Sequence, residues 1–133
     1  MSKNPKIEQL RKVPLFAHCS RRELAGLAAL VDELELPEGQ TVAREGERGR
    51  EFLVLADGIA DVESGGEIVN TLGPGDFFGE ISLVTGEPRT ATVTTRSASK
   101  LFIFSAPAFR SLLHDAPGIK TRVLAAAALR LAA

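Results

Sequence analysis

The chain has 133 residues, of which 44% are hydrophobic and 25% charged, and its formal net charge is −1. This length fits one domain that can bury a core, and the interspersed charges form no basic stripe for binding nucleic acid. The single cysteine, Cys19, excludes an internal disulfide and suits a reducing compartment. The N-terminus has no signal-peptide pattern, and Arg130 interrupts the short apolar tail. We therefore expect a cytoplasmic protein with no membrane span.

Residues 1–36 are predicted to form an N-terminal helical segment. Ser20 and Glu23 have the spacing of a capping box, and apolar residues then recur at helical intervals until Pro37 ends the pattern.

Residues 37–104 have the character of a compact β domain. Short runs rich in Val, Ile, Thr and Phe alternate with turn signals such as "EGERG", "ADG", "SGGE" and "GPGD". The runs are "TVAR", "EFLVLA", "IADVE", "EIVNTL", "TATVTT" and "KLFIF". Turns at intervals of roughly 8 to 12 residues predict an antiparallel barrel or sandwich. One stretch interrupts the β pattern, and residues 80–85 are predicted to form a single helical turn.

Residues 105–133 are predicted to form two C-terminal helices, with a break near Pro117. The whole chain is therefore predicted to be one α+β, mainly β domain. Its centre is an antiparallel, jelly-roll-like β-roll, preceded by the helical segment and followed by the two helices.

The segment "FGEISLVTGEPRTATV", residues 78–93, places a carboxylate and a guanidinium on either side of this helical turn. A helix N-terminus after Gly79 offers backbone N–H groups to an anion, and Arg89 can bind a phosphate bidentately. Glu80 only accepts hydrogen bonds when ionised, so it suits a ligand that also presents hydroxyl groups. The pair predicts a sugar phosphate bound at both ends. In the alternative, Glu80 complements the helix dipole and Arg89 pairs with a nearby glutamate on a solvated loop.

This segment resembles the phosphate-binding cassette of cyclic nucleotide-binding domains. The matching residues are Phe78, Gly79, Glu80, Leu83, Pro88, Arg89, Ala91 and Val93. The resemblance extends upstream through "LPEGQTVAREGE", "FLVLADGIADV" and "LGPGDFFGE", and it covers most of residues 10–133.

The resemblance implies roles for individual residues. Glu80 would accept the ribose 2′-hydroxyl and Arg89 would pair with the cyclic phosphate. Backbone N–H groups near Gly79, Ile81, Ser82 and Thr90, with Ala91 beside them, would complete the phosphate site. The apolar neighbours of the purine would be Val54, Leu72 and Val93.

The family often places a C-terminal helix over the base as a lid. In this chain Ile119, Val123, Ala126, Ala127 and Arg130 share one helical face, and Arg130 could stack over the base. In the alternative, these C-terminal residues are frayed and solvated. The sequence has no Trp or Tyr and no Phe beyond Phe109, so no aromatic lid residue is available.

The resemblance implies a non-enzymatic regulatory module, with cyclic AMP as the better ligand and cyclic GMP binding measurably. In this family a hydroxyl at Thr90 can reach the guanine amine. No cofactor is expected, and two separated histidines do not suggest a metal site. The expected partner is an effector that contacts the C-terminal helices, either in a longer chain or in another protein. The alternative function is a protein-interaction domain that keeps the fold without binding nucleotide.

Overall fold

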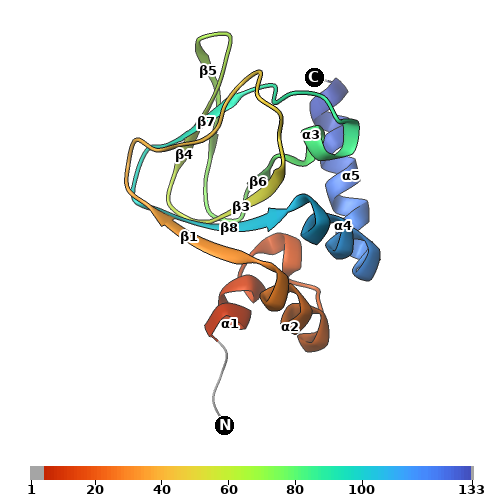
Figure 1. Ribbon diagram of the computed structural model, residues 1–133. Coiled ribbons are helices and arrows are strands. Elements are labelled where there is room, and N and C mark those ends of the chain that lie inside the picture. Colours follow the sequence, from red (N-terminus) through yellow and green to blue (C-terminus); the bar gives the residue numbers. More distant parts are fainter. Residues whose placement is uncertain (1–4, 133) are drawn as a thin grey trace.

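The computed structural model describes residues 5–132, and the side chains of residues 5–130. Residues 1–4 and 133 of the predicted domain lie outside the described residues. Figure 1 shows strands in the middle of the chain and helices toward both ends. The helical elements are α1 (Pro5–Arg11), the short 3-10 helix η1 (Pro14–Phe16), α2 (Arg21–Leu30), α3 (Glu80–Thr85), α4 (Ala106–Asp115) and α5 (Pro117–Ala132). The strands are β1 (Asp32–Leu36), β2 (Thr41–Ala43), β3 (Glu51–Asp57), β4 (Ala60–Ser64), β5 (Glu67–Leu72), β6 (Phe77–Phe78), β7 (Thr92–Thr95) and β8 (Ser99–Ser105).

The strands form two antiparallel sheets with the orders β1-β8-β3-β6 and β2-β7-β4-β5. Side chains from both sheets share one buried apolar cluster, which includes Leu53 and Leu101 from the first sheet and Leu72 and Val93 from the second. The sheets therefore fold over each other as a roll. The predicted mainly β fold, a β-roll with flanking helices, is confirmed.

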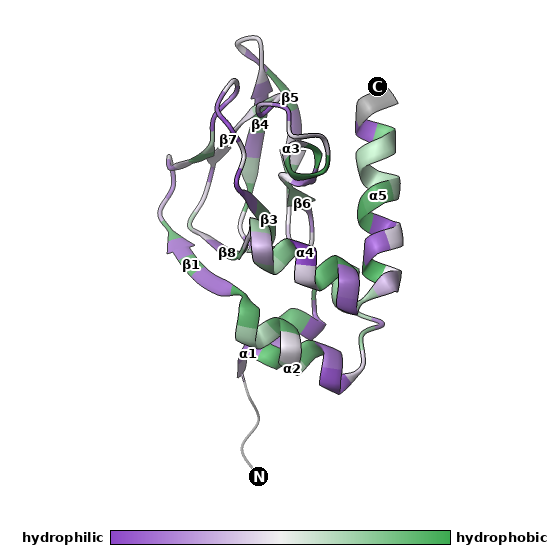
Figure 2. Ribbon diagram, turned by 45° about the vertical axis from the view of Figure 1, so that its right-hand side comes forward, coloured by the Kyte–Doolittle hydropathy of each residue, from purple (hydrophilic) through white to green (hydrophobic). Residues whose placement is uncertain are grey.

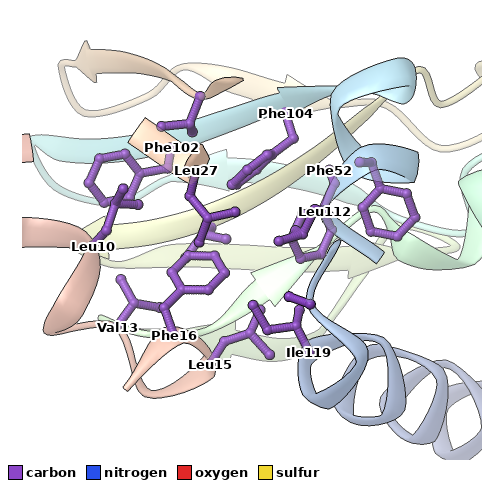
Figure 3. Packing of buried hydrophobic residues seen from close by; sticks show 14 of the residues in the cluster. Leu10, Val13, Leu15, Phe16, Leu27, Phe52, Phe102, Phe104, Leu112 and Ile119 are labelled. Carbon is purple, nitrogen blue, oxygen red and sulfur yellow. The ribbon is translucent and has the colours of Figure 1, made fainter. Parts of the chain in front are cut away.

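A second apolar cluster joins the outer face of the first sheet to the helices (Figure 3). Strand β3 contributes to both clusters because successive side chains of a strand point to opposite faces. Phe52 and Val54 pack against the helices, whereas Leu53 and Leu55 face the interior of the roll. The helices therefore depend on the roll for their own burial.

Local sequence signals position the helices. The capping box at the start of α2 is present, with Ser20 accepting from the Glu23 N–H and the Glu23 side chain accepting from the Ser20 N–H. Helix α5 stands beside the roll next to α3 (Figure 2), and it buries Ile119, Val123 and Ala127. None of the helices within residues 5–132 is both long and apolar enough to span a bilayer.

The predicted helical segment is too long at its C-terminal end. Helix α2 ends at Leu30, and residues 32–36 form β1, which pairs antiparallel with β8 from Asp32↔Ile103 to Leu36↔Ser99. The acidic sequence "DELEL" has little intrinsic strand propensity. Pairing with an interior strand of the sheet overrides that propensity, and local pattern reasoning could not detect this.

Candidate functional site

The helical turn expected between the strands is α3, and glycines with left-handed backbone conformations flank it. Gly79 has φ 97° before the helix and Gly86 has φ 75° after it, a region that favours glycine. Gly79 is also sterically constrained, because a Cβ there would lie 2.5 Å from Arg89 Nη1 and 2.6 Å from the Glu51 carbonyl oxygen. No larger residue fits between β6, α3 and Arg89.

The loop between β2 and β3 holds Arg89 in place. The Arg89 N–H donates to the Glu47 carbonyl over 2.8 Å, and the Arg89 carbonyl accepts from the Gly46 N–H at 2.8 Å. The side-chain Nη2 donates to the Glu51 carbonyl over 2.9 Å. Backbone groups on both sides thus fix the direction of the guanidinium.

Gly49 is a positioning residue that the sequence reasoning missed. A Cβ at Gly49 would lie 2.7 Å from Ser82 Cβ and 2.8 Å from both Cζ and Nε of Arg89. This glycine therefore leaves room for the guanidinium to lie against the 46–51 loop. The sequence signal is the second glycine of "EGERG", a pattern that by itself predicts only a turn.

Glu80 is the first residue of α3 and is fully buried. Its Oε1 accepts from Arg130 Nη1, and the Arg130 Nη2 donates to the Phe77 carbonyl over 2.8 Å. Burial raises the pKa of Glu80, although the positive charges of Arg130 and Arg89 partly oppose this rise. Burial also lowers the pKa of Arg89, but a guanidinium remains charged under all ordinary conditions. Burial thus removes part of the hydration of two opposite charges in the same site, the Glu80 carboxylate and the Arg89 guanidinium.

Each of these two side chains has one atom without a partner. Glu80 Oε2 and Arg89 Nη1 are the only buried polar atoms among the side chains of residues 5–130 that lack a hydrogen-bond partner. An unpaired buried polar atom costs about 1–3 kcal/mol, and more when it is charged. Such atoms are rare in folded proteins and call for a specific explanation. One is a hydrogen-bond acceptor and the other a donor, so a ligand that satisfies both must bring a donor and an acceptor.

A cavity of about 590 Å³ contains both unpartnered side chains. This volume is within the range of small-molecule sites. Ten of the predicted site residues line it, namely Leu72, Gly79, Glu80, Ile81, Ser82, Arg89, Thr90, Ala91, Val93 and Arg130. The remaining lining residues were not predicted from the sequence, and they are Ala43, Val62, Ser64, Val69, Asn70 and Phe78. Most of these come from β4 and β5, whose register decides which side chains face inward.

Val54 was predicted to contact the purine, but it does not line this cavity. It is fully buried in the cluster between the first sheet and the helices. Val54 lies in a strand, as predicted, but its side chain points away from the interior of the roll. Its neighbours Leu53 and Leu55 are the residues of β3 that face the roll interior. Val54 is therefore removed from the candidate site.

Arg130 lies in the site, in an arrangement that the sequence did not predict. Its guanidinium pairs with Glu80 and lies 5.3 Å from the centre of the Phe77 ring. The apolar stripe of α5 packs against the rest of the protein, with Val123 and Ala127 buried. Helix α5 thus contacts the cassette through Glu80 Oε1, while the other oxygen of that carboxylate, Oε2, has no partner. Whether Arg130 also contacts a base stays a prediction.

A larger hollow, of about 830 Å³, lies elsewhere, between the α1–η1 region and the ends of β1, β3 and β8. Neither of the two unpartnered buried atoms lies there. The 590 Å³ cavity is the better candidate for a ligand site, because two of the residues that line it have buried polar atoms without hydrogen-bond partners.

Fold and site together define a β-roll whose cavity contains one buried acceptor and one buried donor without partners. The sequence profile of the cyclic nucleotide-binding domain family matches residues 33–116. The chain therefore belongs to the cyclic nucleotide-binding domain family, and the resemblance seen in residues 78–93 is confirmed.

Relatives and solved structures agree with this assignment. The cAMP-dependent protein kinase regulatory subunit of Mycosarcoma maydis is 36% identical over 122 residues, which cover 85% of this chain and 23% of that protein. The structure of cAMP-bound PfPKA-R has a TM-score of 0.77 and 26% identity, and the match covers 84% of this chain and 39% of that chain. This chain spans about a quarter of the length of the curated relatives that it matches.

A further solved structure shares the fold alone. It is the regulatory subunit of a cAMP-independent protein kinase A from Trypanosoma brucei, with a TM-score of 0.80 and 21% identity over 89% of this chain and 45% of that chain. The β-roll by itself therefore does not determine the ligand, which depends on the residues that line the site.

Proposed function

We propose that this chain is a non-enzymatic regulatory module that binds a cyclic nucleotide through Glu80 and Arg89. The observation that carries the proposal is the pair of buried, unpartnered atoms, Glu80 Oε2 and Arg89 Nη1, in one cavity. A cyclic nucleotide supplies the complementary groups on one rigid ring system. Its ribose 2′-hydroxyl donates to Oε2, and its phosphate oxygens accept from Nη1.

The surrounding residues suit this ligand. The N-terminal turn of α3 brings backbone N–H groups next to the phosphate position. One guanidinium balances the single negative charge of a cyclic phosphate. The wall formed by Val62, Leu72 and Val93 is apolar and can pack against the base.

Cyclic AMP is proposed as the better ligand and cyclic GMP as a weaker one. Support for cyclic AMP comes from relatives, since the Mycosarcoma maydis protein is named for cAMP dependence and PfPKA-R was solved with cAMP bound. The competing proposal is a protein-interaction domain that keeps the fold and binds no nucleotide. Two unpartnered buried polar atoms count against it, because such a domain would have no reason to retain them.

The module is proposed to signal through α5. Arg130 on α5 pairs with Glu80 Oε1, so a ligand that binds Oε2 changes the charge and hydrogen bonding at the point where α5 contacts the cassette. A ligand shifts a conformational equilibrium only by such differential contacts. The proposed partner is an effector that reads the position of α5, in the same chain or in another protein.

Binding without catalysis is part of the proposal. Residues 5–132 contain no group of three His, Cys, Asp or Glu side chains that could hold a metal ion. Incubating the protein with cyclic AMP and measuring AMP by chromatography would detect hydrolysis, and turnover would contradict this part.

Isothermal titration calorimetry with cyclic AMP tests the binding proposal. Arg89→Ala is expected to cost about 2–5 kcal/mol of binding free energy, as for removal of one member of a buried charge pair. Arg89→Lys should recover only part of the loss, because an ammonium cannot bind bidentately. The matched control is Arg96→Ala, since Arg96 pairs with Asp61 on the surface and does not line the cavity. Equal affinity in the Arg89→Ala variant and the wild type would refute the proposal.

A further inference from the structure

Ser82, in the first turn of α3, has a buried hydroxyl group without a protein partner. The buried hydroxyl-bearing side chains among residues 5–130 are Ser82, Thr95 and Ser99. Thr95 and Ser99 each donate to a backbone carbonyl, over 2.8 Å and 2.9 Å respectively. The Ser82 hydroxyl has no hydrogen-bond partner in this part of the chain. Buried polar groups are nearly always hydrogen-bonded, so the partner of this hydroxyl is to be sought outside the chain.

Ser82 lacks the local hydrogen bond that hydroxyl groups in helices often make. Such a hydroxyl can donate to the carbonyl four residues earlier, as Thr85 Oγ1 does to the Ile81 carbonyl over 2.7 Å. The residue four positions before Ser82 is Phe78, which lies in β6. The chain then turns through Gly79, with φ 97°, before the helix begins. Helix α3 therefore offers Ser82 no carbonyl of its own at that position.

The Ser82 side chain lies beside Arg89 in the wall of the 590 Å³ cavity. A Cβ at Gly49 would lie 2.7 Å from Ser82 Cβ and 2.8 Å from Arg89 Cζ, so the two side chains lie against the same glycine. Ser82 is only 6% exposed, but its hydroxyl oxygen is not fully enclosed, unlike Glu80 Oε2 and Arg89 Nη1. A ligand in the cavity can therefore reach this hydroxyl.

A hydroxyl beside the guanidinium suits the phosphate end of the proposed ligand. The two non-bridging oxygens of a cyclic phosphate share one negative charge, and each can accept more than one hydrogen bond. Hydrogen bonds to an ionised acceptor are stronger than those between neutral groups, and a serine hydroxyl rotates to suit its acceptor. The hydroxyl is uncharged, so it adds a contact while the guanidinium remains the group that balances the charge.

We propose that the Ser82 hydroxyl donates to one of the two non-bridging oxygens of the cyclic phosphate, and so makes the site distinguish between them. This inference rests on the proposed cyclic nucleotide function. The two oxygens are not equivalent, because the phosphorus belongs to a ring that is fused to the ribose. One hydroxyl proton from a fixed direction can serve only one of them. Ser82 is then a specificity residue for the stereochemistry at phosphorus.

The Rp and Sp phosphorothioates of cyclic AMP test this contact, because each replaces one of the two non-bridging oxygens by sulfur, a weak acceptor. The full chain is titrated by calorimetry with cyclic AMP and with both diastereomers, as wild type and as Ser82→Ala and Thr85→Ala variants. Thr85→Ala is the matched control, since it removes a hydroxyl from the same helix, and Thr85 is exposed and does not line the cavity. Urea unfolding of the unliganded proteins measures any structural role of the Ser82 hydroxyl.

Ser82→Ala is expected to weaken cyclic AMP by about tenfold, as for one hydrogen bond. It should weaken by a similar factor the one diastereomer that keeps the oxygen contacted by Ser82, and leave the other unchanged. The stability of the unliganded protein should not fall, because the hydroxyl has no protein partner to lose.

The inference is overturned if Ser82→Ala loses no affinity, if the two diastereomers lose equally, if Thr85→Ala reproduces the loss, or if Ser82→Ala is less stable than the wild type. Each of these results leaves the proposed function intact, provided that the wild type binds cyclic AMP and Arg89→Ala weakens it. If the wild type binds none of the three nucleotides, the proposed function fails and this inference fails with it.

Discussion

Replacing Gly49 by alanine tests whether the 46–51 loop positions Arg89 for binding. Gly49 does not have a positive φ, so the backbone accepts alanine, but the new Cβ would lie 2.7 Å from Ser82 Cβ and 2.8 Å from the Cζ of Arg89. Separations this short force the neighbours to shift, and overpacking of this kind typically costs about 1–3 kcal/mol of folding stability. The guanidinium is the more movable neighbour, and its displacement would break the hydrogen bond to the Glu51 carbonyl.

The expected loss of cyclic AMP affinity in the Gly49→Ala variant is about 1–3 kcal/mol, which is roughly five- to 150-fold. This loss of affinity should not exceed the loss caused by Arg89→Ala. Calorimetry gives the affinity, and urea unfolding gives the stability of the same sample. Gly73→Ala is the matched control, because a Cβ there meets nothing within 4 Å and Gly73 also lacks a positive φ.

A double-mutant cycle identifies the mechanism. If Gly49→Ala acts through Arg89, the Gly49→Ala, Arg89→Ala double variant binds no more weakly than Arg89→Ala alone. Two results would refute the reasoning. One is wild-type affinity in Gly49→Ala, and the other is a loss that adds in full to that of Arg89→Ala.

Two further predictions concern Glu80 and Arg130. Burial raises the pKa of Glu80, so in the unliganded protein the protonated carboxyl is stabilising, and this contribution is lost as pH rises through the folded-state pKa. The affinity for cyclic AMP should change with pH in the opposite direction to the stability, because the ribose hydroxyl donates to the Glu80 carboxylate. Cyclic AMP affinity should therefore fall on acidification from neutral pH in the wild type and stay flat in Glu80→Gln, and parallel profiles would contradict the assignment. Arg130→Ala should weaken cyclic AMP by at most about tenfold, since the Arg130 side chain is 38% exposed and solvent screens the pair. It should also increase amide hydrogen exchange at the end of α5, and unchanged exchange would remove Arg130 as the link between the cassette and α5.

Much of the fold could be predicted because local signals and tertiary structure agree. The capping box of α2, the turn glycines and the helical turn at 80–85 all depend on neighbours in sequence. Strand β1 could not be predicted this way, because its acidic residues become a strand only through pairing with β8. The order of strands within each sheet likewise depends on contacts between segments far apart in the chain.

The candidate site likewise contains residues that the local sequence indicates and residues that only contacts between distant segments bring together. Glu80 and Arg89 belong to a compact motif, and their chemistry alone indicated a ligand with a phosphate and a hydroxyl. The places of Asn70 and Val54 depend on strand register and on which face of a strand points inward. The role of Gly49 depends on the close approach of a loop to Arg89 and Ser82. A shift of one residue along β3 separates Val54 from Leu53 and Leu55 and decides which of them faces the roll interior. The pairing of Arg130 with Glu80 joins residues 50 positions apart, and no local pattern indicates it.

The claim that one ligand engages Glu80 and Arg89 together is tested most directly by a crystal structure of the chain grown with saturating cyclic AMP. The account predicts the nucleotide in the 590 Å³ cavity, with its 2′-hydroxyl hydrogen-bonded to Glu80 Oε2, a phosphate oxygen hydrogen-bonded to Arg89 Nη1, and Arg130 still on Oε1. An empty cavity under those conditions, or a nucleotide bound with both atoms still unpartnered, would contradict it.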